Sequence, residues 1–242
     1  MRIAMWSGPR NISTGLMRAW ENRPDTFVWD EPLYASYLLK TGRQHPGADE
    51  IIEHDESDWQ KVVDRLLGDI PDGNSIFYLK QMTHHLLPEI GREWIGKMTN
   101  CFLIRDPREM LTSYLNIDQL PEPELDDIGL PQQWEIFELV RNITGEIPPV
   151  LDSKDVLDHP RIMLEGLCAR IGVNFYEEML SWPAGSRETD GIWAKYWYAG
   201  VEKTTGFQPY KPKQNEVPDH LQELLQSCLE IYNRLYEYRM LP

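Results

Sequence analysis

The stretch WSGPRNISTGLMRAW, residues 6–20, decides the fold, because it joins an apolar run, Ile3-Ala4-Met5, to a helical pattern through a loop suited to anions. A strand that ends in such a loop and opens a helix presents free N–H groups at the positive end of the helix dipole. Arg10 adds a planar cation suited to phosphate-like oxygens, and Ser13 and Thr14 add hydroxyl groups. The alternative reading is an ordinary helix with Ser13 as its N-cap.

The same alternation of apolar runs, breaks and helical patterns recurs outward from this stretch. It predicts an α/β fold with a central, mostly parallel sheet flanked by helices, in a single domain over residues 1–242. The expected strands are Ile3–Trp6, Phe27–Trp29, Ile76–Leu79, Cys101–Ile104 and a short one ending near Val150-Leu151. The expected helices are Ser13–Glu21, Leu33–Lys40, Asp58–Leu67, His85–Lys97, Arg108–Ile117, Gln132–Ile143, Pro160–Ile171 and a closing helix from about Asp219 to Tyr238.

Composition excludes several classes of protein. The chain has 24 Lys plus Arg against 39 Asp plus Glu, and its net charge of −15 makes a nucleic acid a poor partner. No apolar run approaches the ~20 residues that span a bilayer, and the start lacks the apolar region of a secretory signal, so we expect a soluble, cytoplasmic protein with no membrane partner. The three Cys residues lack metal-like spacing and lie in apolar segments, which is typical of reduced core thiols.

A second stretch, CFLIRDPREMLTSYL at residues 101–115, has the same strand-to-helix form. Asp106 suits an N-cap and Pro107 a first helical turn, but helix capping gives no reason for Arg105 at the end of a buried strand. In open α/β sheets, ligands bind beyond the carboxyl ends of the strands. A small anion is therefore compatible with the acidic chain, provided that the cations near Arg10 and Arg105 converge, since distant charge is screened over ~8–10 Å.

The first loop lacks the Gly-Lys-Ser/Thr ending of nucleotide hydrolases and kinases, whose hydroxyl holds Mg²⁺. Without that ligand a triphosphate would be difficult to neutralise, so we expect an anion that reacts without a metal. A sulfuryl group carries less charge than a phosphoryl group, and Arg, Lys and backbone donors suffice for its transfer.

The segments PRNIST and IRDPREMLTS resemble the two cofactor signatures of the sulfotransferase family, which uses 3′-phosphoadenosine 5′-phosphosulfate (PAPS) as donor on a P-loop-like α/β fold. The segment from Val150 to Leu180 resembles the family's strand, acidic-Leu turn, Pro-started helix and Leu-Gly-like turn. Together these segments span most of the chain in the expected order.

The resemblance implies a donor site at these segments. Arg10 stands where the family's loop cation contacts the 5′-phosphosulfate, while Arg105 and Ser113 would hold the 3′-phosphate. The 5′-phosphate would be wrapped by Asn11, Ile12, Ser13 and Thr14. The chain departs from the family at Ile12, where a small residue is usual, and at Gly15, where many members carry a Trp that stacks on adenine.

Near the carboxyl end, the family's Arg-Lys-Gly signature is absent, and VEKTTGF at residues 201–207 is the nearest candidate. There Lys203 or the following backbone would close over the nucleotide. The alternative is a simple turn, because Gly and Thr clusters commonly mark turns.

A third stretch, FYLKQMTHHLLP at residues 77–88, carries candidate catalytic residues. Lys80 ends a strand, and His84 and His85 follow; a neutral imidazole is a suitable base near pH 7. The resemblance implies that a His, with His85 favoured over His84, takes the acceptor proton while Lys80 stabilises the bridging oxygen as the donor leaves. The alternative is that one His caps or packs a helix.

Other segments remain open in function. Asp30 is expected to cap the next helix, while Glu31 is an alternative base or a ligand for a cationic acceptor. Residues 44–58 and 121–131 are long acidic connections, each either a lid or a solvated loop. The aromatic segment 191–200 is expected to be core or to line an acceptor pocket. Four further histidines, His45, His54, His159 and His220, are expected at the surface.

These patterns predict a metal-independent sulfotransferase that moves a sulfuryl group from PAPS to a hydroxyl or amine of a small-molecule acceptor. One alternative is a degenerate P-loop kinase, which Mg²⁺-dependent turnover of ATP would favour. Another is a nucleotide-binding module without catalysis, which loss of both His84 and His85 would leave unchanged. No pattern in the sequence identifies the acceptor or the oligomeric state.

Overall fold

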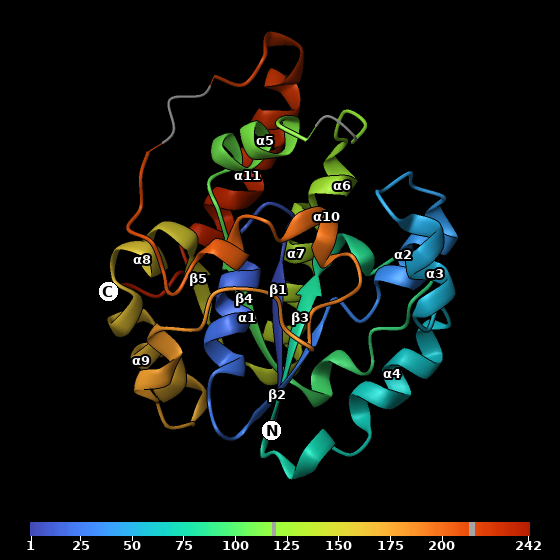
Figure 1. The fold of residues 1–242 in the computed structure, drawn as a ribbon. Helices are drawn as coiled ribbons and strands as arrows, with labels where there is room; N and C mark the ends of the chain where they lie inside the picture. Colours follow the sequence, from blue (N-terminus) through green and yellow to red (C-terminus); the bar gives the residue numbers. More distant parts are fainter. Residues whose placement is uncertain (118–119, 213–215) are drawn as a thin grey trace.

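A computed structural model describes residues 1–117, 120–212 and 216–242. Its centre is a five-stranded, all-parallel sheet in the order β2-β3-β1-β4-β5 (Figure 1). The strands are β1 (Arg2–Ser7), β2 (Thr26–Asp30), β3 (Ile76–Met82), β4 (Thr99–Ile104) and β5 (Val150–Asp152). The predicted fold class and all five predicted strands are confirmed.

The helices connect these strands or cover the sheet. The α-helices are α1 (Ser13–Glu21), α2 (Tyr34–Thr41), α3 (Ala48–His54), α4 (Trp59–Leu67), α5 (Pro107–Leu115), α6 (Leu125–Ile128), α7 (Leu130–Thr144), α8 (Ser153–Asp158), α9 (Pro160–Ile171), α10 (Ala194–Trp197) and α11 (Gln222–Tyr236). The 3-10 turns are η1 (Pro71–Gly73), η2 (Thr83–His85), η3 (Ile95–Lys97), η4 (Glu177–Leu180), η5 (Val201–Lys203) and η6 (Asp219–Leu221).

The two faces of the sheet are buried by different helices, because side chains alternate along each strand. On β1, Ala4 and Trp6 join a core with α4, α7 and α11, while Ile3 and Met5 pack on the other face with α1 and α9. Cys101, Cys168 and Cys228 are all buried in these cores, as the sequence predicted. Burial on both faces explains why the strands are nearly continuous apolar runs.

The carboxyl ends of the strands form one edge of the sheet, beyond which α5, α6 and α10 lie (Figure 1). Because β1 lies between β3 and β4, the chain leaves it toward one side and later returns to build the other. That reversal is the point at which open parallel sheets bind ligands. The loops after β1, β2, β3 and β4 all meet there.

One predicted helix, His85–Lys97, is wrong. The structure has the turns η2 and η3 with an irregular segment between them. Pro88 and Gly91 disfavour a helix, and side chains satisfy the backbone instead: Arg92 Nη1 donates to the carbonyl of Leu87 at 2.8 Å and Trp94 Nε1 to that of Gly91 at 2.7 Å. The connections at 44–58 and 121–131 are not irregular loops, because they contain α3 and α6. A lid at either connection stays a prediction.

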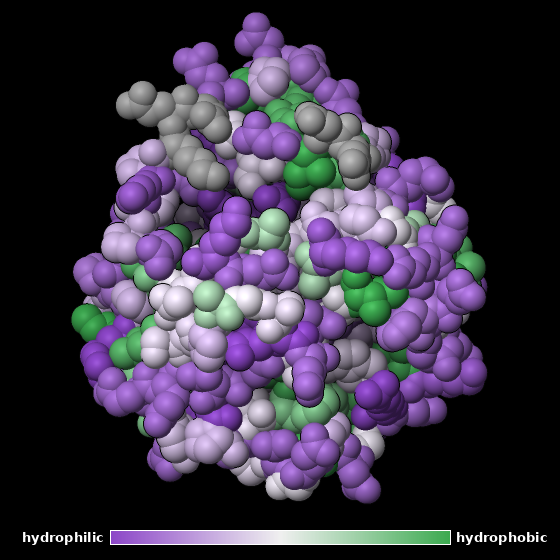
Figure 2. Space-filling model, viewed as in Figure 1, coloured by the Kyte–Doolittle hydropathy of each residue, from purple (hydrophilic) through white to green (hydrophobic). Residues whose placement is uncertain are grey.

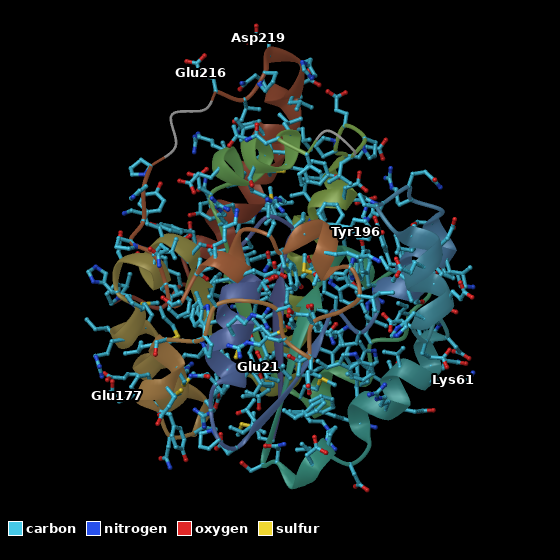
Figure 3. The ribbon with its side chains drawn as sticks, viewed as in Figure 1. Glu21, Lys61, Glu177, Tyr196, Glu216 and Asp219 are labelled. Carbon is cyan, nitrogen blue, oxygen red and sulfur yellow. The ribbon has the colours of Figure 1, made fainter. Side chains whose placement is uncertain are left out.

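The exterior is mainly hydrophilic on the face that Figure 2 shows, where hydrophobic residues form small separate patches. Lys61 and Glu177 lie at the periphery and extend away from the sheet, whereas Tyr196 of α10 lies toward the edge where the strands end (Figure 3). Within the described ranges, no helix has the length and apolar character required to cross a bilayer.

Candidate active site

A cavity of about 730 Å³ opens at the carboxyl edge of the sheet. At one end it is lined by the β1–α1 loop, the start of α5 and the segment 204–211; we call this the cationic end. At the other end it is lined by residues that follow β2 and β3; we call this the histidine end. The predicted site residues that line the cavity are Arg10, Asn11, Ile12, Ser13, Thr14, Lys80, His84, His85, Arg105 and Ser113.

The β1–α1 loop leaves the start of α1 open. Its N-cap is Ile12, which has no side-chain capping bond, so the expectation of Ser13 as N-cap is wrong and Ser13 is the first helical residue. Asn11 fixes the loop instead: its Nδ2 donates to the carbonyl of Leu103 at 3.0 Å, and its Oδ1 accepts from the hydroxyl of Ser153 at 2.5 Å. The first amides of α1 therefore face the cavity side of a loop already held in shape.

Arg10 and Arg105 converge at the cationic end. Arg105 Nη1 donates to the carbonyl oxygen of Arg10 at 2.5 Å, and Arg10 Nε donates to Ser113 Oγ at 3.2 Å. Burial, followed by the charge of Arg105, lowers the pKa of Arg10. Arg10 also has a left-handed backbone, with φ of 55°, which is uncommon for a residue other than glycine. Two cations and a hydroxyl from distant segments thus share one small volume.

One carboxylate already lies among these cations. Glu109 Oε2 accepts from Arg105 Nε at 3.2 Å and from Nη2 at 3.1 Å, and the hydroxyl of Tyr210 donates to Glu109 as well. Asp106 accepts from the backbone N–H of Arg108 at 2.8 Å and Pro107 is the first helical residue, as predicted.

The segment 204–211 covers the cationic end, but Lys203 does not line the cavity and is exposed. Its neighbours do so, among them Phe207, Tyr210 and Lys211. The sequence reading missed these residues, and it missed Trp182, whose backbone N–H donates to the carbonyl of Thr205 at 3.1 Å. The sequence signal for Trp182 was Gly15, which lacks the aromatic side chain that many family members carry at that position. A Cβ on Gly15 would lie 3.9 Å from the Trp182 ring, which occupies the neighbouring space.

At the histidine end, Lys80 is the centre of a buried ion cluster. Its Nζ donates to Asp30 Oδ1 at 2.9 Å, to the Tyr198 hydroxyl at 2.9 Å and to Glu31 Oε1. Burial opposes the charge, but the two carboxylates raise the pKa of Lys80 well above its usual value. The expectation that Asp30 caps the next helix is wrong, because the N-cap of α2 is Leu33. Asp30 forms an ion pair instead, so all three N–H donors of Lys80 are engaged.

The two predicted histidines are packed among aromatic rings. The ring of His85 stacks on Tyr34 at 4.7 Å and on Tyr37 at 4.8 Å between centroids. Burial lowers the pKa of His84 to about 3 and that of His85 well below its usual value. Both rings are therefore neutral at pH 7. Their Nδ1 atoms are buried and have no partner among the described residues.

Two further expectations are resolved at this end. His45 is not a surface residue: its Nδ1 lies 2.8 Å from the Tyr34 hydroxyl, it lines the cavity, and burial lowers its pKa to about 4. The aromatic segment 191–200 fits both of its readings, because Trp193 is buried in the core while Trp197 and Tyr198 line the cavity.

The arrangement suits a substrate with an anionic half and a neutral half. The cationic end has donors for two anionic groups, and the histidine end has aromatic walls; Glu31 and Asp127 also line the cavity. Among residues 1–117, 120–212 and 216–242, no three His, Cys, Asp or Glu side chains are grouped to hold a metal ion.

Comparison with known families shows the family to which the chain belongs. The family model "Sulfotransferase domain" matches residues 1–238, so the chain belongs to the sulfotransferase domain family. Its fold is similar to that of the "Sulfotransferase Domain from the Synechococcus PCC 7002 Olefin Synthase", at a TM-score of 0.57 and 16% identity over 100% of this chain and 96% of that one. It is also similar to the sulfotransferase domain from the curacin biosynthetic pathway, at a TM-score of 0.53 and 17% identity over 99% and 98%.

Two curated relatives from Arabidopsis thaliana carry a different name. The chain is 34% identical over 235 residues to "Branched-chain-amino-acid aminotransferase-like protein 1" and 32% identical over 234 residues to "Branched-chain-amino-acid aminotransferase-like protein 2". Each match covers 96% of this chain but only 41% of the relative. The chain therefore spans less than half the length of these relatives.

Proposed function

We propose that this protein transfers a sulfuryl group from PAPS to a hydroxyl or amine of a small-molecule acceptor. Family membership supports the reaction class. The observation that carries the choice of donor is the convergence of Arg10, Arg105 and Ser113 beside the open start of α1. PAPS has a phosphosulfate and a separate 3′-phosphate, and this end of the cavity presents two guanidinium groups for two such anions.

The donor would lie along the cationic end. In this arrangement Arg10 and the amides of Ser13 and Thr14 bind the 5′-phosphosulfate, with Asn11 and Ile12 shaping the loop. Arg105 and Ser113 bind the 3′-phosphate, for which Arg105 exchanges part of its contact with Glu109. Lys211, from the covering segment, takes the place that the sequence reading gave to Lys203.

The adenine would lie between the β1–α1 loop and Trp182. The aromatic side chain is missing at Gly15, and the indole of Trp182 occupies the adjoining space. Base–aromatic stacking contributes ~1–3 kcal/mol. Trp182 also contacts Phe207 edge-on, with 5.0 Å between the ring centroids, and both rings line the cavity.

The acceptor would enter at the histidine end, beside Lys80, His84 and His85. More than half of each Arabidopsis relative lies outside the match, and the relatives are named for a likeness to an aminotransferase. Amino compounds are therefore the first class of acceptor to screen. A small-molecule acceptor without a nucleic acid or membrane partner, and a cytoplasmic location, belong to the same proposal.

Titration with 3′-phosphoadenosine 5′-phosphate (PAP), the product nucleotide, tests the donor site. We expect Arg105→Ala to weaken PAP binding by roughly 10–100-fold in calorimetry, because a charge-assisted contact contributes ~1.5–3 kcal/mol. Arg108→Ala is the matched control, since the Arg108 side chain is largely exposed and its guanidinium pairs only with Asp106 among the described residues. Absence of PAP binding by the wild-type protein, or equal binding by Arg105→Ala, would refute the proposal.

A further inference from the structure

We propose that the acceptor is an alcohol or phenol that carries a separate primary ammonium group, and that Asp127 binds this ammonium. The inference rests on the sulfuryl transfer proposed above and names the class of its acceptor. Three features carry it: the balance of charge around the cavity, the aromatic surroundings of Asp127 and a buried imidazole nitrogen without a partner. The acceptor then brings one positive charge into the otherwise neutral half of the cavity.

Away from the cationic end, the ion pairs around the cavity contain more carboxylates than cations. Lys80 is shared by two carboxylates, as described above. Arg43, two residues after α2, is shared in the same way: its Nη2 lies 2.8 Å from Asp127 Oδ1 and 3.4 Å from Glu124 Oε2. These two groups thus contain four carboxylates and two cations. The net charge of −15, which opposes an anionic donor at long range, attracts a cationic acceptor.

Asp127 is the carboxylate of the second group that lines the cavity, although the residue is only 7% exposed. Besides Arg43, its partner among the described residues is the backbone N–H of Glu124, which donates to Oδ2 at 3.0 Å. Each carboxylate oxygen can accept a further hydrogen bond. Burial raises the pKa of Asp127, so additional positive charge nearby would stabilise its ionised form. Arg43 keeps Glu124 as a partner when an ammonium binds Asp127.

The surroundings of Asp127 are aromatic. Tyr37 of α2 and Tyr114 of α5 both line the cavity. Burial, followed by the charge of Asp127, raises the pKa of each phenol to about 12, so both side chains lie within the field of this carboxylate and stay neutral. An ammonium within ~6 Å of an aromatic ring is attracted to its face. A carboxylate beside two neutral aromatic side chains therefore suits an organic cation.

His84 supplies a hydrogen-bond acceptor at the same wall. It lines the cavity, is 7% exposed, and has a buried Nδ1 without a partner among the described residues. Its ring meets that of Tyr37 edge-on, with 5.2 Å between the centroids. Burial lowers the pKa of His84 to about 3, so the ring is neutral and one nitrogen can accept. A primary ammonium has three N–H donors, enough for a carboxylate and an imidazole together.

The proposed ammonium site adjoins the place where the acceptor would react, because Tyr37 also stacks on His85 at 4.8 Å between centroids. A protonated amine has no free electron pair, so the hydroxyl oxygen of the acceptor forms the new S–O bond. The bond between sulfur and the bridging oxygen breaks, and its electron pair stays on the leaving PAP. The hydroxyl proton passes to a base of the histidine end.

Two matched pairs of ligands test the inference: tyramine against 4-propylphenol, and 5-amino-1-pentanol against 1-hexanol. In each pair a methyl group replaces the ammonium with little change of shape. Calorimetry is performed on the PAP-saturated protein at about pH 7, where an alkylamine with a pKa of ~10.4 is protonated. We expect each amine to bind roughly 10-fold more tightly than its neutral partner, or ~1.4 kcal/mol.

Three substitutions on α6 locate the preference. In Asp127→Asn we expect the preference for the amines to fall below about 2-fold, or ~0.4 kcal/mol, while the neutral ligands bind as they do to wild type. Asp127→Glu keeps the charge and should keep a preference for the amines. Asp126→Asn, which makes the same change at the neighbouring exposed position that does not line the cavity, is the matched control and should behave as wild type.

Equal binding of amines and neutral partners by the wild type, binding of none of the four ligands, or a preference that survives in Asp127→Asn overturns the inference. PAP titration is run on every variant, and intact PAP binding by Asp127→Asn shows that the variant is folded. A wild-type protein that binds PAP but does not prefer the amines refutes only the class of acceptor. A wild-type protein that binds no PAP refutes the proposed function itself.

Discussion

The cationic end and the histidine end of the cavity both contain buried charge, but they are assembled differently. At the cationic end, Arg10 and Arg105 belong to contiguous motifs and the neighbouring donors include backbone amides. At the histidine end, the cluster around Lys80 joins residues up to 168 positions apart in the chain, and Lys80 is already paired with two carboxylates. The first end keeps the free amides of α1 beside its cations, whereas at the second end one lysine is shared by two carboxylates.

This difference predicts that substitutions at the cationic end change mainly ligand binding, whereas substitutions at the histidine end change mainly stability. We expect that removing a cation from the cationic end weakens anion binding at a solvent-accessible site and lowers the free energy of unfolding only modestly. Removing the cation from the histidine end leaves two carboxylates buried without a counter-charge. The three predictions that follow test this contrast, in order of decreasing effect.

The largest effect is expected from Lys80→Met. We expect the free energy of unfolding to fall by about 3–5 kcal/mol, because Asp30 and Glu31 lose their shared cation inside the protein. Urea denaturation measures it. Lys61→Met, which alters an exposed side chain paired with Glu56, should stay within about 0.5 kcal/mol of wild type (Figure 3). A loss below about 1 kcal/mol for Lys80→Met would remove the contrast between the two ends.

The second prediction concerns pH and the neutral histidines. Burial depresses the pKa of His84 to about 3, so between about pH 6.5 and 3 the unfolded chain binds a proton that the folded chain does not. Stability should therefore fall as pH decreases through this window, by at most about 1.4 kcal/mol per pH unit from this group.

Denaturation of His84→Gln across the same window measures the contribution of His84. The variant should lose less stability on acidification than the wild type does, while His54→Gln, at an exposed position, should follow the wild type. If the free energies of unfolding of wild type and His84→Gln fell equally with decreasing pH, the ring would be charged in the folded protein, contrary to its packing.

The smallest effect is expected at the cationic end from Ser113→Ala. The variant loses the hydroxyl that accepts from Arg10 Nε, so PAP binding should weaken by roughly 3–10-fold, or ~0.5–1.5 kcal/mol, with little change in the free energy of unfolding. Calorimetry and urea denaturation measure the two quantities. Ser227→Ala, on the exposed side of α11, is the control. A large loss of stability with unchanged affinity would reverse the assignment of the two ends.

The sequence predicted the cationic end well because its information is local. A strand, a loop and a helix start place Arg10 and Ser13 together, and Arg105 follows the same rule one strand away. Parallel strands bring their carboxyl ends to one edge, so convergence of the two loops followed from fold class alone. Ser13 was misplaced by one position as the N-cap, and that boundary depends on dihedral angles which composition does not determine.

The histidine end was predicted only in part, because its contacts are made across the fold. Nothing near Asp30 in the chain indicates that Tyr198 and Gly191 donate to it, so a helix cap was the expected local role. The helix expected from His85 failed because Arg92 and Trp94 satisfy the backbone carbonyls of a non-helical segment. The sequence indicated Trp182 only indirectly, because Gly15 lacks an aromatic side chain and the Trp182 ring lies beside it.

The amide of Asn11 has a consequence for how quickly a nucleotide is captured. It links the β1–α1 loop to β4 and to the start of α8, so the loop needs little rearrangement when a ligand docks and little chain entropy is lost on docking. Encounter is then governed by the field outside the cavity. Since the chain carries a net charge of −15, an anionic nucleotide approaches against repulsion and is drawn inward only over the last few ångströms.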